Sequence, residues 1–221
     1  MPYFETDFLQ FFEELAANNE KSWFDENRAR YEKMVKKPFA NLVEELIFRV
    51  SQFDPDVQIA PKDAIFRINR DVRFSPDKRP YKTTVSAIIS PAGRKDKSAP
   101  GFYLELSAHR TMLGGGAYFV EKTGLENIRN AIAANPAAFR KLISGKDFVT
   151  KYGEIRGETN KRLPADLQAA AEKEPLIFNK QFYFMAELPA NLALRNDLAD
   201  VAIEYFAAAQ PIILYLREAL R

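Results

Sequence analysis

The chain has 221 residues, a net charge of +2 and 47% hydrophobic residues, a composition typical of a folded globular protein and unlike that of a disordered chain. It contains no cysteine, which excludes disulfides, thiolate metal ligands and cysteine nucleophiles, and its single histidine, His109, leaves few zinc or di-iron arrangements. We therefore expect no metal site, and the sequence indicates no particular cofactor.

Length and sequence pattern favour a single domain spanning residues 1–221. A chain of this length can bury one substantial core, and no repeat, low-complexity linker or change in composition marks a boundary. The first residues lack the basic start, apolar run and cleavage site of a signal peptide, and no run of 18 apolar residues predicts a membrane span. We expect a cytoplasmic protein with no membrane partner, whose oligomeric state the sequence does not indicate.

Helical periodicity dominates the first sixty residues. Apolar residues recur at helical spacing over residues 5–19, where one face is rich in phenylalanine. A second helix is predicted from Ser22. A third is predicted from Pro38, which suits the first turn of a helix because its missing N–H needs no partner there.

The period changes to the alternation of strands after residue 63. Strands of a largely antiparallel sheet are predicted at residues 64–75, 83–90, 102–108 and 109–120, with a further aromatic-rich strand at 175–188. Helices are predicted over residues 123–135, 135–145 and 196–221, the last with a kink or break at Pro211. A helical N-terminal region, a central largely antiparallel sheet and C-terminal helices place the chain in the α+β class.

Positive charge is concentrated in the middle of the chain. Residues 61–100 carry ten Lys or Arg residues and four Asp residues, a net charge of +6, so the rest of the chain carries −4. This asymmetry suggests an anionic ligand near the region. The densest part is Phe66–Thr83, FRINRDVRFSPDKRPYKT, in which basic side chains alternate with aromatic and branched apolar ones.

The arginines of this segment fall into two groups if residues 66–75 form a strand, because side chains then alternate between two faces. Arg70 lies among apolar neighbours, where a guanidinium is costly unless it meets a carboxylate, several carbonyl groups or an anionic ligand. Arg67, Asp71 and Arg73 share the other face, at a spacing that lets both guanidiniums converge on one phosphate or carboxylate. We therefore interpret the segment as a candidate anion site.

Further candidate residues come from the turn that follows and from a neighbouring predicted strand. The turn adds several polar groups that could close a pocket, and Glu105 is a candidate partner for one of the arginines. The candidate ligand-binding set is Arg67, Arg70, Asp71, Arg73, Asp77, Lys78, Tyr81, Lys82 and Glu105. We expect a small anionic molecule bearing a phosphate or carboxylate. Whether the protein is an enzyme stays open; if it is one, carboxylates, Tyr81 and Lys78 are the acid–base candidates.

Two other interpretations of the basic segment are open. Basic residues interleaved with Phe66, Phe74, Tyr81 and Tyr103 on a sheet could stack bases and neutralise phosphates, which predicts binding of single-stranded nucleic acid. Alternatively the segment is a structural ion-pair network or a surface for a protein partner. Salt-dependent binding to single-stranded DNA or RNA would separate the first interpretation from a small-molecule pocket.

A run of three glycines occurs in LGGGAY, residues 113–118. It lacks the Lys-Ser/Thr of a P-loop and the strand-to-helix spacing of a dinucleotide-binding fingerprint. We interpret it as a bulge or a wide hairpin turn, with an anion site made of backbone N–H groups as the alternative.

The segment RINRDVRFSPDKRPYK, residues 67–82, resembles the defining segment of a bacterial family of uncharacterised proteins, domain of unknown function 2461, with its R-x-x-R-D-x-R-F motif followed by D-K-x-x-Y. The resemblance extends to NNEKSWFDENRARYEKMVKKP, GFYLELS, LGGGAY and IRNAI, so it covers most of the chain. It implies a single domain and draws attention to the basic segment. It implies no reaction, substrate or cofactor, because the family has no established activity.

Overall fold

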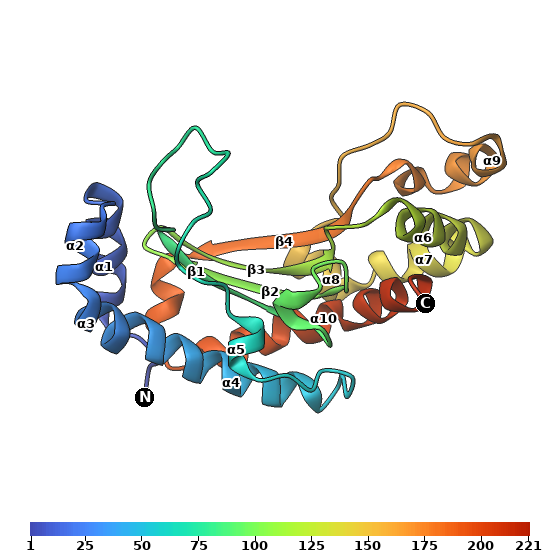
Figure 1. Cartoon of the computed structure of the whole chain (residues 1–221). Coiled ribbons are helices and arrows are strands. Elements are labelled where there is room, and N and C mark those ends of the chain that lie inside the picture. The colour runs from blue at the N-terminus through green and yellow to red at the C-terminus, as the bar shows by residue number, and fades with distance from the viewer.

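The computed structural model describes residues 1–221 and has a four-stranded antiparallel sheet at its centre (Figure 1). The strands lie side by side in chain order: β1 (Thr84–Ile89), β2 (Gly101–Ser107), β3 (Arg110–Ala117) and β4 (Phe182–Pro189). The register places Ser86 opposite Glu105 and Tyr103 opposite Gly114. All three pairings are antiparallel, which confirms the predicted class and sheet.

Helices precede and follow the sheet, as the periodicity predicts. The N-terminal helices are α1 (Thr6–Ala17), α2 (Lys21–Glu26), α3 (Arg28–Tyr31), a π-helical turn (Glu32–Lys36) continuing into α4 (Lys37–Ser51), and α5 (Pro61–Ala64). After β3 come α6 (Lys122–Ala134), α7 (Pro136–Ile143), α8 (Lys146–Tyr152) and α9 (Ala165–Lys173), and α10 (Leu198–Ala219) follows β4. Short 3-10 turns lie at Gly93–Lys95, Pro175–Phe178 and Ala190–Leu194.

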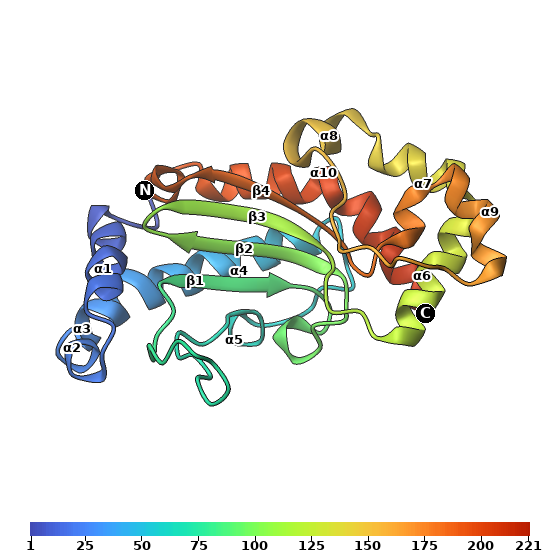
Figure 2. The ribbon, with the colours of Figure 1, turned by 90° about the horizontal axis from the view of Figure 1, so that it is seen from above.

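One face of the sheet is covered by α4 and α10, which lie beneath it in Figure 1. Phe102, Leu104 and Leu106 of β2 are buried on this side, and the Phe102 ring stacks on Phe206 of α10 with ring centroids 4.9 Å apart. Because side chains alternate along a strand, the residues between them turn to the opposite face, which no helix covers. Figure 2 looks onto this open face, with α1–α3 at one end and α6–α9 at the other.

The helix α10 runs for 22 residues and continues through Pro211, so the predicted break is absent. Phe206, Ile213 and Leu216 are among its fully buried residues. By length and composition alone this helix could span a membrane, but 39% of its most apolar window is buried inside the protein. Core helices of water-soluble proteins pass the same test, so this carries little weight.

The predicted strand at residues 64–75 is wrong. Only isolated pairings remain, between Ile65 and Ala87 and between Asn69 and Tyr81. Beyond Phe66 the chain leaves the edge of β1 and forms a projecting loop, and Phe74 is 94% exposed. The apolar and polar residues of this segment therefore alternate although the segment does not join the sheet.

The glycine run is part of β3 and forms neither a bulge nor a turn. At Gly116 φ is +116°, and an added Cβ would lie 2.2 Å from the carbonyl oxygen of Phe182 on β4. Only glycine adopts that conformation at such a close approach of two strands without strain. The run thus lets β3 approach β4 closely and leaves little side-chain bulk on the sheet.

Candidate ligand-binding cavity on the open face

A cavity of about 470 Å³ lies on the open face of the sheet. All four strands contribute to its floor, because the side chains that alternate away from α4 and α10 point into it. Gly101 and Gly116, which pair across β2 and β3, line the cavity without adding a side chain to its floor. The cavity therefore follows directly from the register and the glycines.

The lining of the cavity combines aromatic, thioether and charged groups. The aromatic residues are Phe66, Tyr103, Tyr118, Phe119 and Tyr183, the thioethers are Met112 and Met185, and the charged residues are Lys82, Lys97 and Glu105. Most of this surface is apolar with a few polar groups, the composition expected of a pocket that binds an organic molecule.

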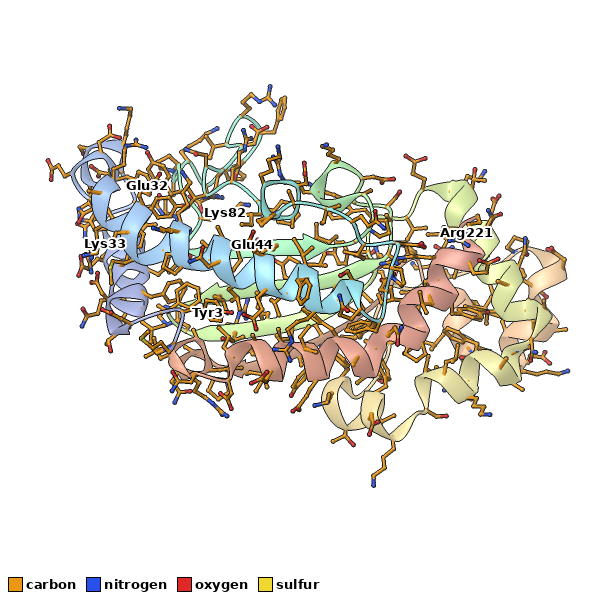
Figure 3. All side chains as sticks on the ribbon, turned by 90° about the horizontal axis from the view of Figure 1, so that it is seen from below. Tyr3, Glu32, Lys33, Glu44, Lys82 and Arg221 are labelled. Atoms are coloured by element: carbon orange, nitrogen blue, oxygen red, sulfur yellow. The ribbon has the colours of Figure 1, made fainter.

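Two lysines lie beside the same aromatic ring at the edge of the cavity. The Nζ atoms of Lys82 and Lys97 are 5.3 and 5.6 Å from the centre of the Phe66 ring, and Lys97 Nζ is also 5.4 Å from that of Phe119. Neither lysine forms an ion pair within 4.0 Å. Figure 3, seen from the helical side, shows Lys82 in the loop that precedes β1. Both ammonium groups thus lack a protein anion.

A tyrosine and a carboxylate face the cavity from β2. The Tyr103 hydroxyl donates to Glu105 Oε2 at 2.8 Å, and Thr84 Oγ1 lies 3.5 Å from the same oxygen. Burial, followed by the nearby Glu105 charge, raises the pKa of Tyr103 above its usual value. Glu105 has no arginine within ion-pair distance, so the predicted pairing with an arginine of the basic segment is wrong.

The projecting loop, residues 66–83, is called here the basic arm (Figure 1). Its two limbs pair through hydrogen bonds from Arg70 N to Pro80 O and from Lys82 N to Ile68 O, both 2.8 Å. The arm leaves the sheet on the open side, at the end where α1–α3 lie. Most of the residues expected to bind a ligand therefore lie on a loop beside the cavity and outside it.

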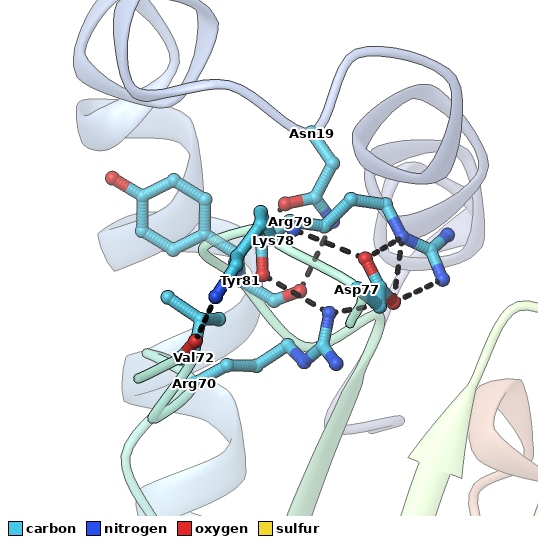
Figure 4. A network of polar contacts seen from close by, with 7 residues as sticks. All are labelled: Asn19, Arg70, Val72, Asp77, Lys78, Arg79 and Tyr81. Carbon is cyan, nitrogen blue, oxygen red and sulfur yellow. Dashed lines mark hydrogen bonds and ion pairs between the residues drawn. The ribbon is translucent and has the colours of Figure 1, made fainter. Parts of the chain in front are cut away.

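The arginine singled out by the sequence finds its anion within the arm (Figure 4). Arg70 Nη1 lies 2.7 Å from Asp77 Oδ2 and donates to the Arg79 carbonyl at 3.0 Å. Arg79 binds the same carboxylate at 2.7 Å. Hydrogen bonds from Arg79, followed by the Arg70 guanidinium, hold the pKa of Asp77 well below its usual value. Arg70 is partly exposed and paired within the arm, because no strand forms there to place it on the apolar face of a sheet.

Other residues predicted to bind the ligand also pair with groups of the arm itself. Asp71 pairs with Arg73 at 2.7 Å in an exposed position, and Lys78 Nζ donates to the Val72 carbonyl at 3.0 Å. Arg67 is exposed and forms no ion pair, yet it lies close enough to Lys82 to lower the pKa of that amine. Of the nine predicted residues, only Lys82 and Glu105 line the cavity.

Tyr81 anchors the arm to the N-terminal helices. Asn19 accepts a hydrogen bond from Tyr81 N and donates one to Tyr81 O, both at 3.0 Å, as Figure 4 shows. The Tyr81 ring is buried and stacks on Phe24 of α2 with centroids 4.0 Å apart. Because the Tyr81 ring lies in the core, it does not line the cavity. Lys78 does not line it either.

Several lining residues carry no signal in the sequence. Lys97 belongs to a polar loop between β1 and β2, and nothing in its neighbourhood sets it apart from Lys95. Tyr183 and Met185 were predictable in part, since alternation along the aromatic strand places them on one face. Their meeting with Tyr103 depends on the β3–β4 register, which pattern alone does not determine.

A second hollow, of about 830 Å³, lies where α6 begins and α10 ends. Its arginines already have partners, since Arg217 lies 2.7 Å from Asp54, and Arg221 lies 3.3 Å from Asp56 and 3.1 Å from Glu218. A hollow whose cations are neutralised by the protein has less need of an anionic ligand. The cavity on the open face, with two unpaired lysines, is the stronger candidate.

Comparison with known proteins gives a family but no activity. Among curated proteins, none matches the chain. The sequence model of a family described as "Conserved hypothetical protein (DUF2461)" matches residues 7–215, which is nearly the whole chain and includes the basic arm and every strand of the sheet. The chain therefore belongs to the family of conserved hypothetical proteins designated domain of unknown function 2461.

Proposed function

We propose that the cavity on the open face binds a small organic molecule that carries a phosphate or carboxylate group. The observation behind the proposal is the pair Lys82 and Lys97, two ammonium groups beside an aromatic-lined cavity that have no carboxylate partner. Two like charges beside one ring repel each other, and an anion bound between them would remove that repulsion. Arg67 adds a third unpaired cation nearby.

The rest of the lining suits the organic part of such a molecule. Tyr103, Tyr183 and Phe119 offer ring faces and edges, and Met185 offers a polarizable thioether. Glu105 can accept a hydrogen bond from a hydroxyl or amino group on the ligand, because its only close partners are two protein hydroxyls. The volume lies within the range of roughly 300–1,000 Å³ common among small-molecule pockets.

Single-stranded nucleic acid is the second candidate, favoured by Phe66 and Tyr103 lying near two lysines. The four aromatic residues that the sequence suggested as a stacking surface are separated, however. Tyr81 is 6% exposed and packs in the core, and Phe74 lies far out on the basic arm with 94% of its surface exposed. A bounded cavity therefore favours a small molecule over a strand of several nucleotides.

Thermal shift with a set of matched probes tests the proposal. Phenyl phosphate and benzoate each combine a ring with an acidic group, whereas inorganic phosphate and benzyl alcohol each supply one half. Binding to the native state raises Tm by mass action, so the two complete probes should raise Tm more than either half at the same concentration. No shift with any acidic probe would overturn the proposal, and a shift with a single-stranded oligonucleotide alone would favour the second candidate.

Two variants locate the effect in the cavity. Lys82→Met removes one unpaired cation and should abolish the shift caused by phenyl phosphate. Arg73→Gln removes a cation that is exposed on the basic arm and paired with Asp71, so it should leave the shift unchanged. A shift lost in Arg73→Gln and kept in Lys82→Met would move the site to the arm and contradict the proposal.

A further inference from the structure

The side chain of Lys82 differs from the other lysine of the basic arm. Lys78 extends along the arm and donates to the Val72 carbonyl at 3.0 Å. Lys82 is half-buried at the edge of the cavity, and its Nζ has neither a carboxylate within 4.0 Å nor a hydrogen-bond acceptor in the protein. Its closest described contact is the ring face of Phe66. The amine thus has no polar partner in the protein and is left free to react.

The charges around Lys82 favour the neutral amine. Burial, followed by the positive charges of Lys97 and Arg67, lowers the pKa of Lys82, and the carboxylate of Glu105 opposes them. These groups come from the arm, the loop after β1 and strand β2. A lysine that is partly desolvated and next to other cations is the type that serves as a nucleophile toward carbonyl compounds.

Strand β2 supplies the same cavity with a carboxylate that can move protons. Tyr103 and Glu105 share a hydrogen bond of 2.8 Å and line the same cavity as Lys82. Glu105 can accept a proton. The Tyr103 hydroxyl stays protonated because burial and Glu105 raise its pKa, so it orients the Glu105 carboxylate through their hydrogen bond. An amine that attacks a carbonyl group needs such a nearby group to take up and return protons.

We infer that Lys82 forms an imine with an aldehyde or ketone that also carries an acidic group, with Lys97 of the cavity lining holding the acid, an inference that rests on the proposed function of the cavity. The neutral amine attacks the carbonyl carbon, a C–N bond forms, and the carbonyl oxygen takes up the two amine hydrogens and leaves as water. The product is a C=N bond, and no electrons are gained or lost. The substrate class is therefore a carbonyl acid with a compact or planar body.

Trapping with borohydride tests the inference, with 4-carboxybenzaldehyde as the probe. Borohydride reduces the C=N bond to a stable secondary amine, so peptide mass spectrometry identifies each modified lysine. We expect the adduct to form first on Lys82, well ahead of the exposed Lys78. Benzaldehyde, which lacks the acid, should modify Lys82 more slowly. Equal modification of Lys82 and Lys78 would overturn the inference.

The variant Lys82→Arg separates the failure of this inference from the failure of the proposed function. Arginine keeps the positive charge but does not form an imine, so benzoate should still raise Tm while the adduct at position 82 disappears. If benzoate raises Tm in the wild type but no imine forms on Lys82, the imine is wrong and the binding function stands. If benzoate has no effect and no adduct forms, both are wrong.

Discussion

Replacing Asp54 with asparagine should destabilise the protein strongly, because it leaves a buried guanidinium without a counter-charge. Asp54 is 1% exposed and lies 2.7 Å from Arg217, whose side chain is 9% exposed. After the change, the Pro100 carbonyl, 2.8 Å from Arg217 Nε, remains as a neutral acceptor. Removing one partner of a buried ion pair costs about 3–5 kcal/mol. For a chain of this size that corresponds to a fall in Tm of roughly 6–20 °C.

Urea unfolding followed by circular dichroism measures the change, with two further variants for comparison. Asp77→Asn removes a carboxylate from the solvent-exposed basic arm and should shift the midpoint far less. The double change Asp54→Leu with Arg217→Met removes both charges and should recover most of the stability. A loss of less than about 1 kcal/mol for Asp54→Asn, in the range of surface pairs, would show that Arg217 does not depend on Asp54 as a buried counter-charge.

Three further predictions concern the sheet, the basic arm and the cavity. Gly116→Ala should cost at least roughly 1–3 kcal/mol from backbone strain, since φ is +116° and the added Cβ would lie 2.2 Å from a carbonyl oxygen; a wild-type Tm would contradict this. Arg70→Met should speed proteolytic cleavage within the arm while Tm changes little, because its partner Asp77 lies in the same loop, and cooperative loss of the whole fold would show that the arm supports the core. The pKa of Lys82, measured by NMR of ¹³C-methylated lysine, should lie below 10.5. It should rise in Lys97→Gln and fall further in Glu105→Gln, and shifts of the opposite sign would show that these two charges do not act on Lys82. Because the unfolded chain then binds this proton more tightly, the contribution of Lys82 to stability increases as pH rises through the interval between its folded-state pKa and 10.5.

The helices and most strands were predictable because their signals are local. Phenylalanines at helical spacing predicted α1, and the apolar pattern predicted β1, β2 and β3 within three residues of their ends. Residues 66–75 alternate just as clearly, but a strand also needs a partner with free backbone groups. Once the chain passes Phe66 the arm pairs with itself, so the pattern there has no sheet to join.

The candidate site was less predictable than the fold, because partners in space decide it. The carboxylate that pairs with Arg70 belongs to Asp77, only seven residues further along the chain. Charge density drew attention to the arginines, whereas the cavity uses Lys82 from the end of the segment and Lys97 from a separate loop. Only the sheet register and the path of the loop after β1 bring these two lysines to one ring.

Calorimetric titration of phenyl phosphate tests most directly the claim that the cavity on the open face is the ligand site. We expect saturable binding to the wild-type protein, loss of that binding in Lys82→Met, and unchanged binding in Arg73→Gln, whose cation is paired on the arm. Binding that survives in Lys82→Met but disappears in Arg73→Gln would instead assign anion recognition to the basic arm and rule out the cavity as the ligand site.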